Sequence, residues 1–129
     1  MNNMPPNLRA LSVRQPFASL IEVGMKPIEL RSWATNYRGQ VLILSGSRPW
    51  SGKTEWPKVG PLGVTLCVVD LVDCRPAQPT DATKACVEPP PEWFAWVLEN
   101  PRPVARVAVK GRLGLYFPDA TLLAAVAVR

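Results

Sequence analysis

The chain has 129 residues and a mass of 14.2 kDa, and 15 lysines and arginines against 10 acidic residues give it a net charge of +5. This length fits one domain, and a hydrophobic content of 47% excludes a disordered chain. The sequence has no histidine, which excludes an imidazole base, a Ser-His-Asp triad and every histidine-containing metal site. Any catalysis must therefore use lysine, carboxylate, hydroxyl or thiol groups.

The cysteines and the apolar stretches indicate the compartment. Cys67, Cys74 and Cys86 form no C-x-x-C pair, and an odd number cannot complete a set of internal disulfides. No apolar stretch reaches the ~20 residues that cross a bilayer, and the first residues contain no apolar signal region. We expect a cytoplasmic protein with no metal, no cofactor and no membrane association.

Positive charge is concentrated in the first half of the chain. Residues 1–60 carry eight basic and three acidic residues, a net charge of 8 − 3 = +5, whereas residues 61–129 carry seven of each. A basic half on a small domain indicates an anionic partner, most often nucleic acid. Ordinary solubilising charge is the alternative interpretation.

The first half of the chain predicts short elements after a tail. We expect residues 1–8 to form a flexible tail and residues 9–129 to form a single domain. The expected elements are an extended segment at 10–13, a helix from Pro16 to Gly24, a strand at 28–33, a turn at 34–39 and a buried strand at 41–45. Residues 46–61 are predicted to form a long polar loop.

The second half predicts mostly strands. The expected elements are a buried strand at 63–73, an irregular stretch at 75–91, a helix at 92–100, two strands at 104–109 and 113–117, and a last strand or helix at 122–128. Trp93 and Trp96 have the spacing of core residues on a helix. About six short strands without βαβ alternation predict an α+β fold, a small closed or half-closed β-barrel with two short flanking helices.

One window concentrates charged residues. Glu29 and Arg31 lie two residues apart on a predicted strand, so they point to the same face, and Lys26 comes just before it. If that face lines a cleft, a lysine beside a carboxylate could act as a base or orient a water molecule. The alternative is a salt bridge that closes the turn after Gly24.

Two further basic clusters are candidates for phosphate contact. In the long loop, Arg48, Lys53 and Lys58 alternate with Trp50 and Trp56, whose indoles either stack on unpaired bases or fold back to cap the barrel. The second cluster is a sharp turn between predicted strands, at residues 110–112 (Lys-Gly-Arg). Its glycine permits close approach of the backbone to a phosphate, although a plain surface turn would look the same.

The motifs of the chain resemble those of a known family. R-Q-P-F at 14–17, G-x-K-x-x-E-x-R at 24–31 and Y-R-G at 37–39 resemble the opening of an ASCH domain, of the PUA-like superfamily. Residues 68–74, 96–101 and 110–115 match later parts of such domains in the same order. The similarity extends from residue 11 to about residue 117.

The resemblance implies a PUA-like β-barrel with a basic cleft that is lined partly by residues 24–31 and binds RNA or single-stranded nucleic acid. The nucleic-acid-binding residues expected in this protein are Lys26, Arg31, Trp33, Tyr37, Arg38, Arg48, Lys53 and Lys110. The oligomeric state does not follow from the sequence.

The resemblance also implies an enzymatic alternative. Some small bacterial relatives hydrolyse N4-acetylcytidine with a lysine, a threonine three positions later and a glutamate from a later strand, and others have been assigned ribonuclease activity. Lys26 matches the lysine, Glu29 replaces the threonine, and Asp70 or Asp73 is the candidate for the later carboxylate. Ser45 and Gly46 stand where relatives often carry His-Ala.

The sequence therefore leaves three hypotheses. The first is a nucleic-acid-binding module. The second is a histidine-free amidohydrolase or ribonuclease with Lys26 and Glu29 as catalytic residues. The third is an interaction domain whose pocket takes a peptide or a small ligand.

Overall fold

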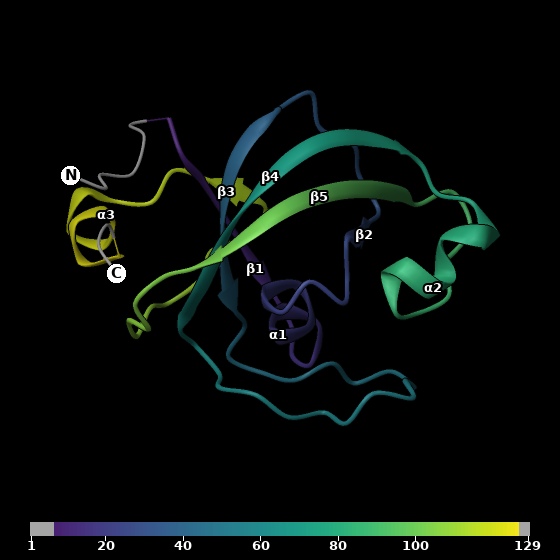
Figure 1. Ribbon diagram of the computed structural model, residues 1–129, viewed down its shortest axis with the longest axis horizontal. Coiled ribbons are helices and arrows are strands. Elements are labelled where there is room, and N and C mark those ends of the chain that lie inside the picture. The colour runs from purple at the N-terminus through teal and green to yellow at the C-terminus, as the bar shows by residue number, and fades with distance from the viewer. Residues whose placement is uncertain (1–6, 127–129) are drawn as a thin grey trace.

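Six strands form one curled, mixed sheet in the order β2-β5-β4-β3-β1-β6 (Figure 1), in a computed structural model that describes residues 7–126. The strands are β1 (Arg9–Val13), β2 (Ile28–Arg31), β3 (Gly39–Ser45), β4 (Thr65–Pro76), β5 (Phe94–Pro103) and β6 (Leu115–Tyr116). β1 and β3 are parallel, and the other neighbours are antiparallel. The predicted α+β class and barrel-like sheet of about six strands are confirmed, with the sheet curled into a half-barrel.

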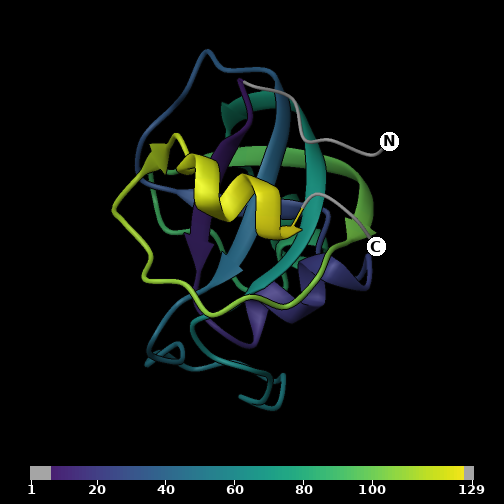
Figure 2. The ribbon, with the colours of Figure 1, turned by 90° about the vertical axis from the view of Figure 1, so that its left-hand side faces the viewer.

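Three short α-helices accompany the sheet. They are α1 (Phe17–Glu22), α2 (Ala82–Ala85), which follows the 3-10 turn η1 (Pro79–Asp81), and α3 (Ala120–Val126). α1 is the helix predicted after Pro16, and α3 lies across the face formed by β1, β3 and β4 (Figure 2). Within residues 7–126, none of the helices has the length and apolar character needed to span a membrane.

Residues 41–44 of β3 are all apolar because both faces of the sheet are covered there. On β3, Val41 and Ile43 belong to the cluster that includes α1, whereas Leu42 and Leu44 belong to the cluster under α3. Successive side chains of a strand point to opposite faces, so two covered faces require two apolar sets. The run of apolar residues in β3 therefore records two layers of packing.

The helix predicted over residues 92–100 is wrong, because residues 94–100 form the first part of β5. The helical spacing of its apolar residues is also compatible with a strand, and Phe94, Trp96 and Leu98, two residues apart, all pack on the cluster around α1. β2 and β4 supply backbone partners on both sides of this segment, so sheet pairing outweighs the local pattern. Trp96 is fully buried, as expected, but from a strand.

The C-terminal third is less regular than predicted. Residues 104–109 form no strand, although Thr65 and Val109 donate backbone hydrogen bonds to Val107 and Gly63 at 3.1 and 2.9 Å. The strand expected at 113–117 shrinks to the two residues of β6, and the segment expected as strand or helix at 122–128 is helical as far as Val126. Residues 127–129, and residues 1–6 of the expected tail, lie outside the described residues. Leu8 is buried in the cluster under α3.

Replacing Ile43, which is fully buried in the middle of β3, is expected to destabilise the fold. Ile43→Ala should lower the free energy of unfolding by about 2–5 kcal/mol, because it removes apolar contacts and leaves a cavity. Leu113→Ala is the control, since Leu113 is 99% exposed, and its effect should stay within about 0.5 kcal/mol. Urea denaturation measures both, and equal losses would contradict the burial of β3.

Candidate functional site

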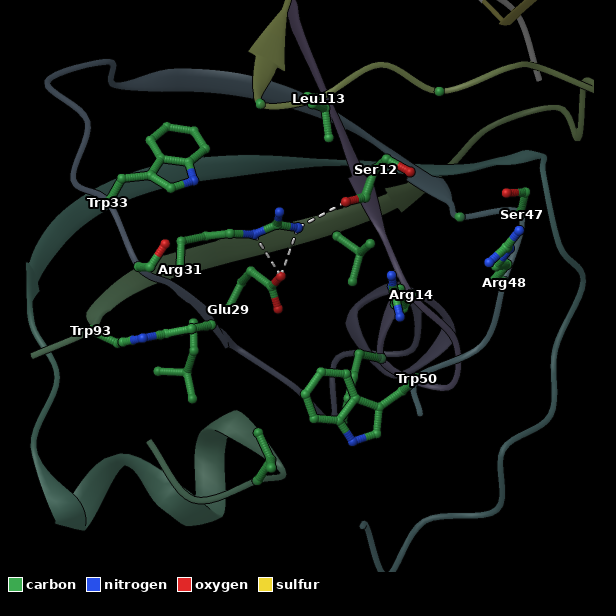
Figure 3. Close-up of a pocket in the computed structure, with 18 of the residues that line it drawn as sticks. Ser12, Arg14, Glu29, Arg31, Trp33, Ser47, Arg48, Trp50, Trp93 and Leu113 are labelled. Atoms are coloured by element: carbon green, nitrogen blue, oxygen red, sulfur yellow. Dashed lines mark hydrogen bonds and ion pairs between the residues drawn. The ribbon is translucent and has the colours of Figure 1, made fainter. Parts of the chain in front are cut away.

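A cavity of about 630 Å³ opens between the two ends of the curled sheet (Figure 3). Its walls come from the end of β1, from β2 and the residues after it, and from the segments that follow β3, follow α2 and precede β6. β2 is the first strand of the sheet and β1 the fifth, so the cavity lies where the half-barrel is not closed by backbone pairing.

Glu29 and Arg31 form an ion pair on the cavity face of β2, as their spacing predicts. Nε of Arg31 donates to Oε2 of Glu29 at 3.0 Å, and Nη2 lies 2.9 Å from the same oxygen. Nη2 also donates to the carbonyl oxygen of Ser12 on β1 at 2.8 Å. The guanidinium therefore joins β2 to β1 across the opening (Figure 3).

Lys26 lies deeper than the sequence suggests. It is 2% exposed, and its Nζ donates to the carbonyl oxygen of Ala85 and lies 3.5 Å from Oε1 of Glu29. The same nitrogen sits 4.9 Å from the centre of the Phe17 ring. Burial lowers the pKa of Lys26 below its ordinary value, although the carboxylate of Glu29 opposes this shift. The salt bridge and the cleft lining, which the sequence left as alternatives, occur together.

The helix that receives Lys26 is held by a second ion pair. Nη1 and Nη2 of Arg75 donate to the two carboxylate oxygens of Asp81 at 2.8 Å each, and the backbone N–H of Gln78 donates to Oδ2 at 2.7 Å. The Arg75 hydrogen bonds lower the pKa of Asp81 to about 2. This pair fixes η1 and α2, and thereby the carbonyl of Ala85.

Three indole rings line the cavity (Figure 3). Trp33 is 36% exposed, and its ring meets the buried Trp96 edge to face, at 4.8 Å between centroids and 88° between planes. Trp50 is half-buried and packs its edge against Phe17 at 5.7 Å. The third ring, Trp93, was assigned to the core of a helix. It lies just before β5 and forms part of the cavity wall. If residues 93–98 are treated as a strand, in which side chains alternate between two faces, Trp93 and Trp96 fall on opposite faces.

Basic side chains outnumber acidic ones around the cavity. Lys26, Arg31 and the four further cations Arg14, Arg48, Lys110 and Arg112 face two carboxylates, Glu29 and Glu88, a balance of 6 − 2 = +4. The four further cations take part in no ion pair among residues 7–126. Arg14 was not selected from the sequence as a site residue, although it begins the R-Q-P-F motif, and Arg112 appeared only within its basic turn.

Five of the eight residues expected to bind nucleic acid line the cavity, and three do not. Those that line it are Lys26, Arg31, Trp33, Arg48 and Lys110. The other three are Tyr37, whose hydroxyl donates to the carbonyl of Gln40 at 2.7 Å, Arg38, whose Nη2 lies 3.8 Å from Asp73, and the exposed Lys53.

The structure does not bring Asp70 or Asp73 to the cavity. Asp70 pairs with Arg102 at 3.0 Å and Asp73 with Arg38, both away from Lys26. Glu29 is therefore the carboxylate that accompanies Lys26. Among the described residues, no group of three or more cysteine, aspartate and glutamate side chains is arranged to hold a metal ion.

Gln15 fixes the long loop beside the cavity. Its fully buried side-chain amide donates to the carbonyl of Pro61 at 2.9 Å and accepts from the backbone N–H of Ser19. The backbone carbonyl of Gln15 accepts from the backbone N–H of Trp50 at 2.7 Å. A Cβ on Gly60 would lie only 2.6 Å from this amide. The R-Q-P-F motif thus positions Trp50, and Trp56 packs on the core without lining the cavity.

The profile of the ASCH domain matches residues 11–108. The chain belongs to the ASCH domain family. It is 31% identical over 134 residues to activating signal cointegrator 1 of Homo sapiens, and 40% identical over 80 residues to activating signal cointegrator 1 of Mus musculus. These alignments cover 87% and 50% of this chain but 22% and 14% of those proteins, so the chain spans about a fifth or less of their length.

Solved structures support the same fold. The crystal structure of ASCH from Zymomonas mobilis superposes with a TM-score of 0.68 at 12% identity, over 96% of this chain and 99% of that one. Two single-substitution variants of the Zymomonas protein give TM-scores of 0.63 and 0.64 at 11% and 10% identity, over 92% and 94% of this chain and 98% and 97% of theirs. At these identities the comparison shows the fold alone. The ASCH domain has a PUA-like fold, which is associated with RNA binding.

The ion pair of Asp81 is expected to make the free energy of unfolding depend on pH in the acidic range. Its folded-state pKa of about 2 lies below the ordinary 3.8, so the pair contributes stability above about pH 4 that is lost as the pH falls towards 2. In Asp81→Asn this contribution is absent, so the two proteins should differ in free energy of unfolding at pH 6 and converge near pH 2. Urea titrations at several pH values measure it.

Arg75→Met is the matched control for that measurement. It removes the other member of the pair, so its pH profile should follow that of Asp81→Asn. If either variant kept the acid dependence of the wild type, a different carboxylate would be responsible.

Proposed function

We propose that this domain binds single-stranded RNA, with a base in the cavity and the phosphates on its rim. The observation that carries the proposal is the ring of four cations without carboxylate partners around a cavity lined by three indoles. Away from the cavity, four cations of the described chain (Arg38, Arg75, Arg102 and Arg106) are paired with acids. An anion that binds at the rim would therefore break no ion pair, because the rim cations have none within residues 7–126.

The indoles supply the contact with the base. Trp33 presents part of its ring to solvent, and its edge-to-face contact with Trp96 holds that ring in place. The indole N–H of Trp96 also donates to the backbone carbonyl of Trp33 at 3.2 Å. A ring fixed in this way loses little entropy when a base stacks on it, and stacking contributes about 1–3 kcal/mol per base.

Arg31 and Lys26 take different parts from those first expected of them. Both are already engaged by the carboxylate of Glu29 and lie at the inner end of the cavity, so they suit the floor of a base pocket better than phosphate contact. Nε and Nη2 of Arg31 are engaged, whereas Nη1 makes no hydrogen bond with the described residues. We assign Nη1 to an acceptor on the edge of the bound base, and we assign the phosphates to Arg14, Arg48, Lys110 and Arg112.

Affinity for a labelled single-stranded RNA should fall steeply with salt. Four phosphate contacts on a single strand predict a slope of log affinity against log salt of about −3, or roughly 50-fold weaker binding between 50 and 200 mM salt. The double variant Arg48→Ala with Lys110→Ala should reduce this slope to about −1.4. Fluorescence anisotropy measures both.

The exposed Lys58, which does not line the cavity, provides the charge control. Lys58→Ala should leave the slope unchanged, whereas Trp33→Ala should weaken binding by about 5- to 150-fold at constant slope, the effect of one lost stack. Absence of binding at 50 mM salt, or an equal effect of Lys58→Ala and of each rim variant, would refute RNA binding at this site.

A second candidate function rests on the state of Lys26. A buried amine with a lowered pKa, 3.5 Å from a carboxylate, is suited to accept a proton. We propose hydrolysis of an N4-acetylated cytidine as the reaction this group would support: water adds to the acetyl carbonyl, Lys26 takes its proton and returns it to the leaving N4 amine, and cytidine and acetate are released. Cleavage of RNA phosphodiesters is the other hydrolysis the sequence suggested.

Turnover of N4-acetylcytidine, followed by mass spectrometry, tests the enzymatic candidate. Lys26→Met should abolish it while RNA binding, which depends on the rim, falls by less than about 5-fold, since a side chain of similar length fills the same space. Thermal unfolding of the variant controls for loss of fold. No acetate from the wild-type protein, together with intact labelled RNA on a gel, would remove hydrolysis as a function of this cavity.

A further inference from the structure

A second hollow of about 510 Å³ lies between the residues that precede β6 and helix α3. Its apolar floor includes Leu122 and Ala125, and its polar groups come from the turn at residues 110–112, from Asp119 and from Thr121. The binding function proposed above does not use this hollow. Its position directly behind the rim of the main cavity makes it the strongest unassigned feature of the described residues.

The two hollows share one wall. Val109, Lys110, Gly111 and Arg112 line both of them. The wall is thin at Gly111, where a Cβ would lie 3.0 Å from Oγ of Ser12, so the backbone of the turn lies close against β1. Both of its cations lack an ion-pair partner among residues 7–126.

We infer that the second hollow is a subsite for the nucleotide adjacent to the one in the main cavity, with the phosphodiester between them held over the turn at residues 110–112. This inference rests on the proposed binding of RNA. An RNA chain that leaves the main cavity across the shared wall would pass Lys110 and Arg112, which have no ion-pair partner in the described chain, and then reach the second hollow. The apolar floor suits the face of a sugar or a base, and the cations suit the phosphate.

Asp119 gives this subsite a preference for ribose. Its Oδ1 accepts the backbone N–H of Leu122 at 2.8 Å and so caps α3, whereas Oδ2 makes no hydrogen bond with the described residues. A carboxylate oxygen repels a phosphate but accepts a hydrogen bond from a 2′-hydroxyl, which distinguishes RNA from DNA. The subsite therefore takes a ribonucleotide, with its 2′-hydroxyl donating to Oδ2 of Asp119.

The test compares short competitors of the labelled RNA. The four ribonucleoside 5′-monophosphates probe the main cavity alone, and the sixteen ribodinucleotides probe both subsites. We expect the best dinucleotide to compete at least 10-fold more strongly than the best mononucleotide. Equal competition would overturn the inference and leave the proposed function standing, whereas failure of mononucleotides, dinucleotides and labelled RNA to bind would overturn the proposed function itself.

Two neighbouring alanines of α3 offer a matched pair of variants. Both are exposed, but Ala125 lines the second hollow and Ala124 does not. Ala125→Trp fills the hollow and should lower the affinity for dinucleotides to that for mononucleotides. Ala124→Trp should leave the difference between these two affinities unchanged. If the two variants behaved alike, the hollow would serve another occupant, such as a peptide, and the inference would fail.

Asp119→Asn tests the contact with ribose without removing the cap, because asparagine also accepts the N–H that caps the helix. The variant should weaken the binding of ribodinucleotides by about 10-fold, the effect of one hydrogen bond to a charged group, and leave the binding of deoxyribodinucleotides unchanged. An equal effect on both series would overturn the assignment of Asp119. Mononucleotide affinity should not change in either case.

Discussion

The hydrogen bond from Arg31 to the backbone of Ser12 closes a sheet that its strands leave open. β2 and β1 are the first and fifth of six strands, and in a curled sheet their ends approach each other without enough room or alignment for backbone pairing. A guanidinium spans this gap, held in plane by Glu29. β1 and β2 are consequently held apart by the length of the Arg31 side chain, and the space between them is part of the cavity.

The buried charges depend on one another. Glu29 stands between Lys26 and Arg31, and removal of the carboxylate would leave two cations at low exposure without a counter-charge, a loss that commonly costs about 3–5 kcal/mol. Nζ of Lys26 also donates to the carbonyl of Ala85. Glu29 on β2 is therefore linked through Lys26 to helix α2. Because Glu29 engages both cations of the floor, the four rim cations, unpaired among the described residues, contribute most of the positive field. In the function proposed above, this division assigns contact with a base to the floor and contact with the phosphates to the rim.

The sequence predicted some features of this fold better than others. The alternation of Glu29 and Arg31, the buried β3 and the overall α+β barrel follow from side-chain periodicity, which local sequence records directly. The strand at residues 94–103 does not, since its conformation depends on two partners that are distant in the chain. Trp93 and Arg14 reach the cavity for the same reason, because non-local pairing places them there. Similarly, the alternation of residues in β4 does not show which face of the strand is turned towards Lys26. It therefore does not predict that Asp70 lies away from the cavity.

The position of β1 has a consequence for how the molecule is made. This strand, near the start of the chain, pairs on one side with β3 and on the other with β6, more than 100 residues later in the sequence. Contacts between distant segments form slowly because the intervening chain must first be ordered. The cavity draws its walls from residues next to β1 and next to β6, so it is completed only when the last strand docks. The strands from β1 to β5 can pair before β6 does, and the cavity is then among the last parts of the fold to form.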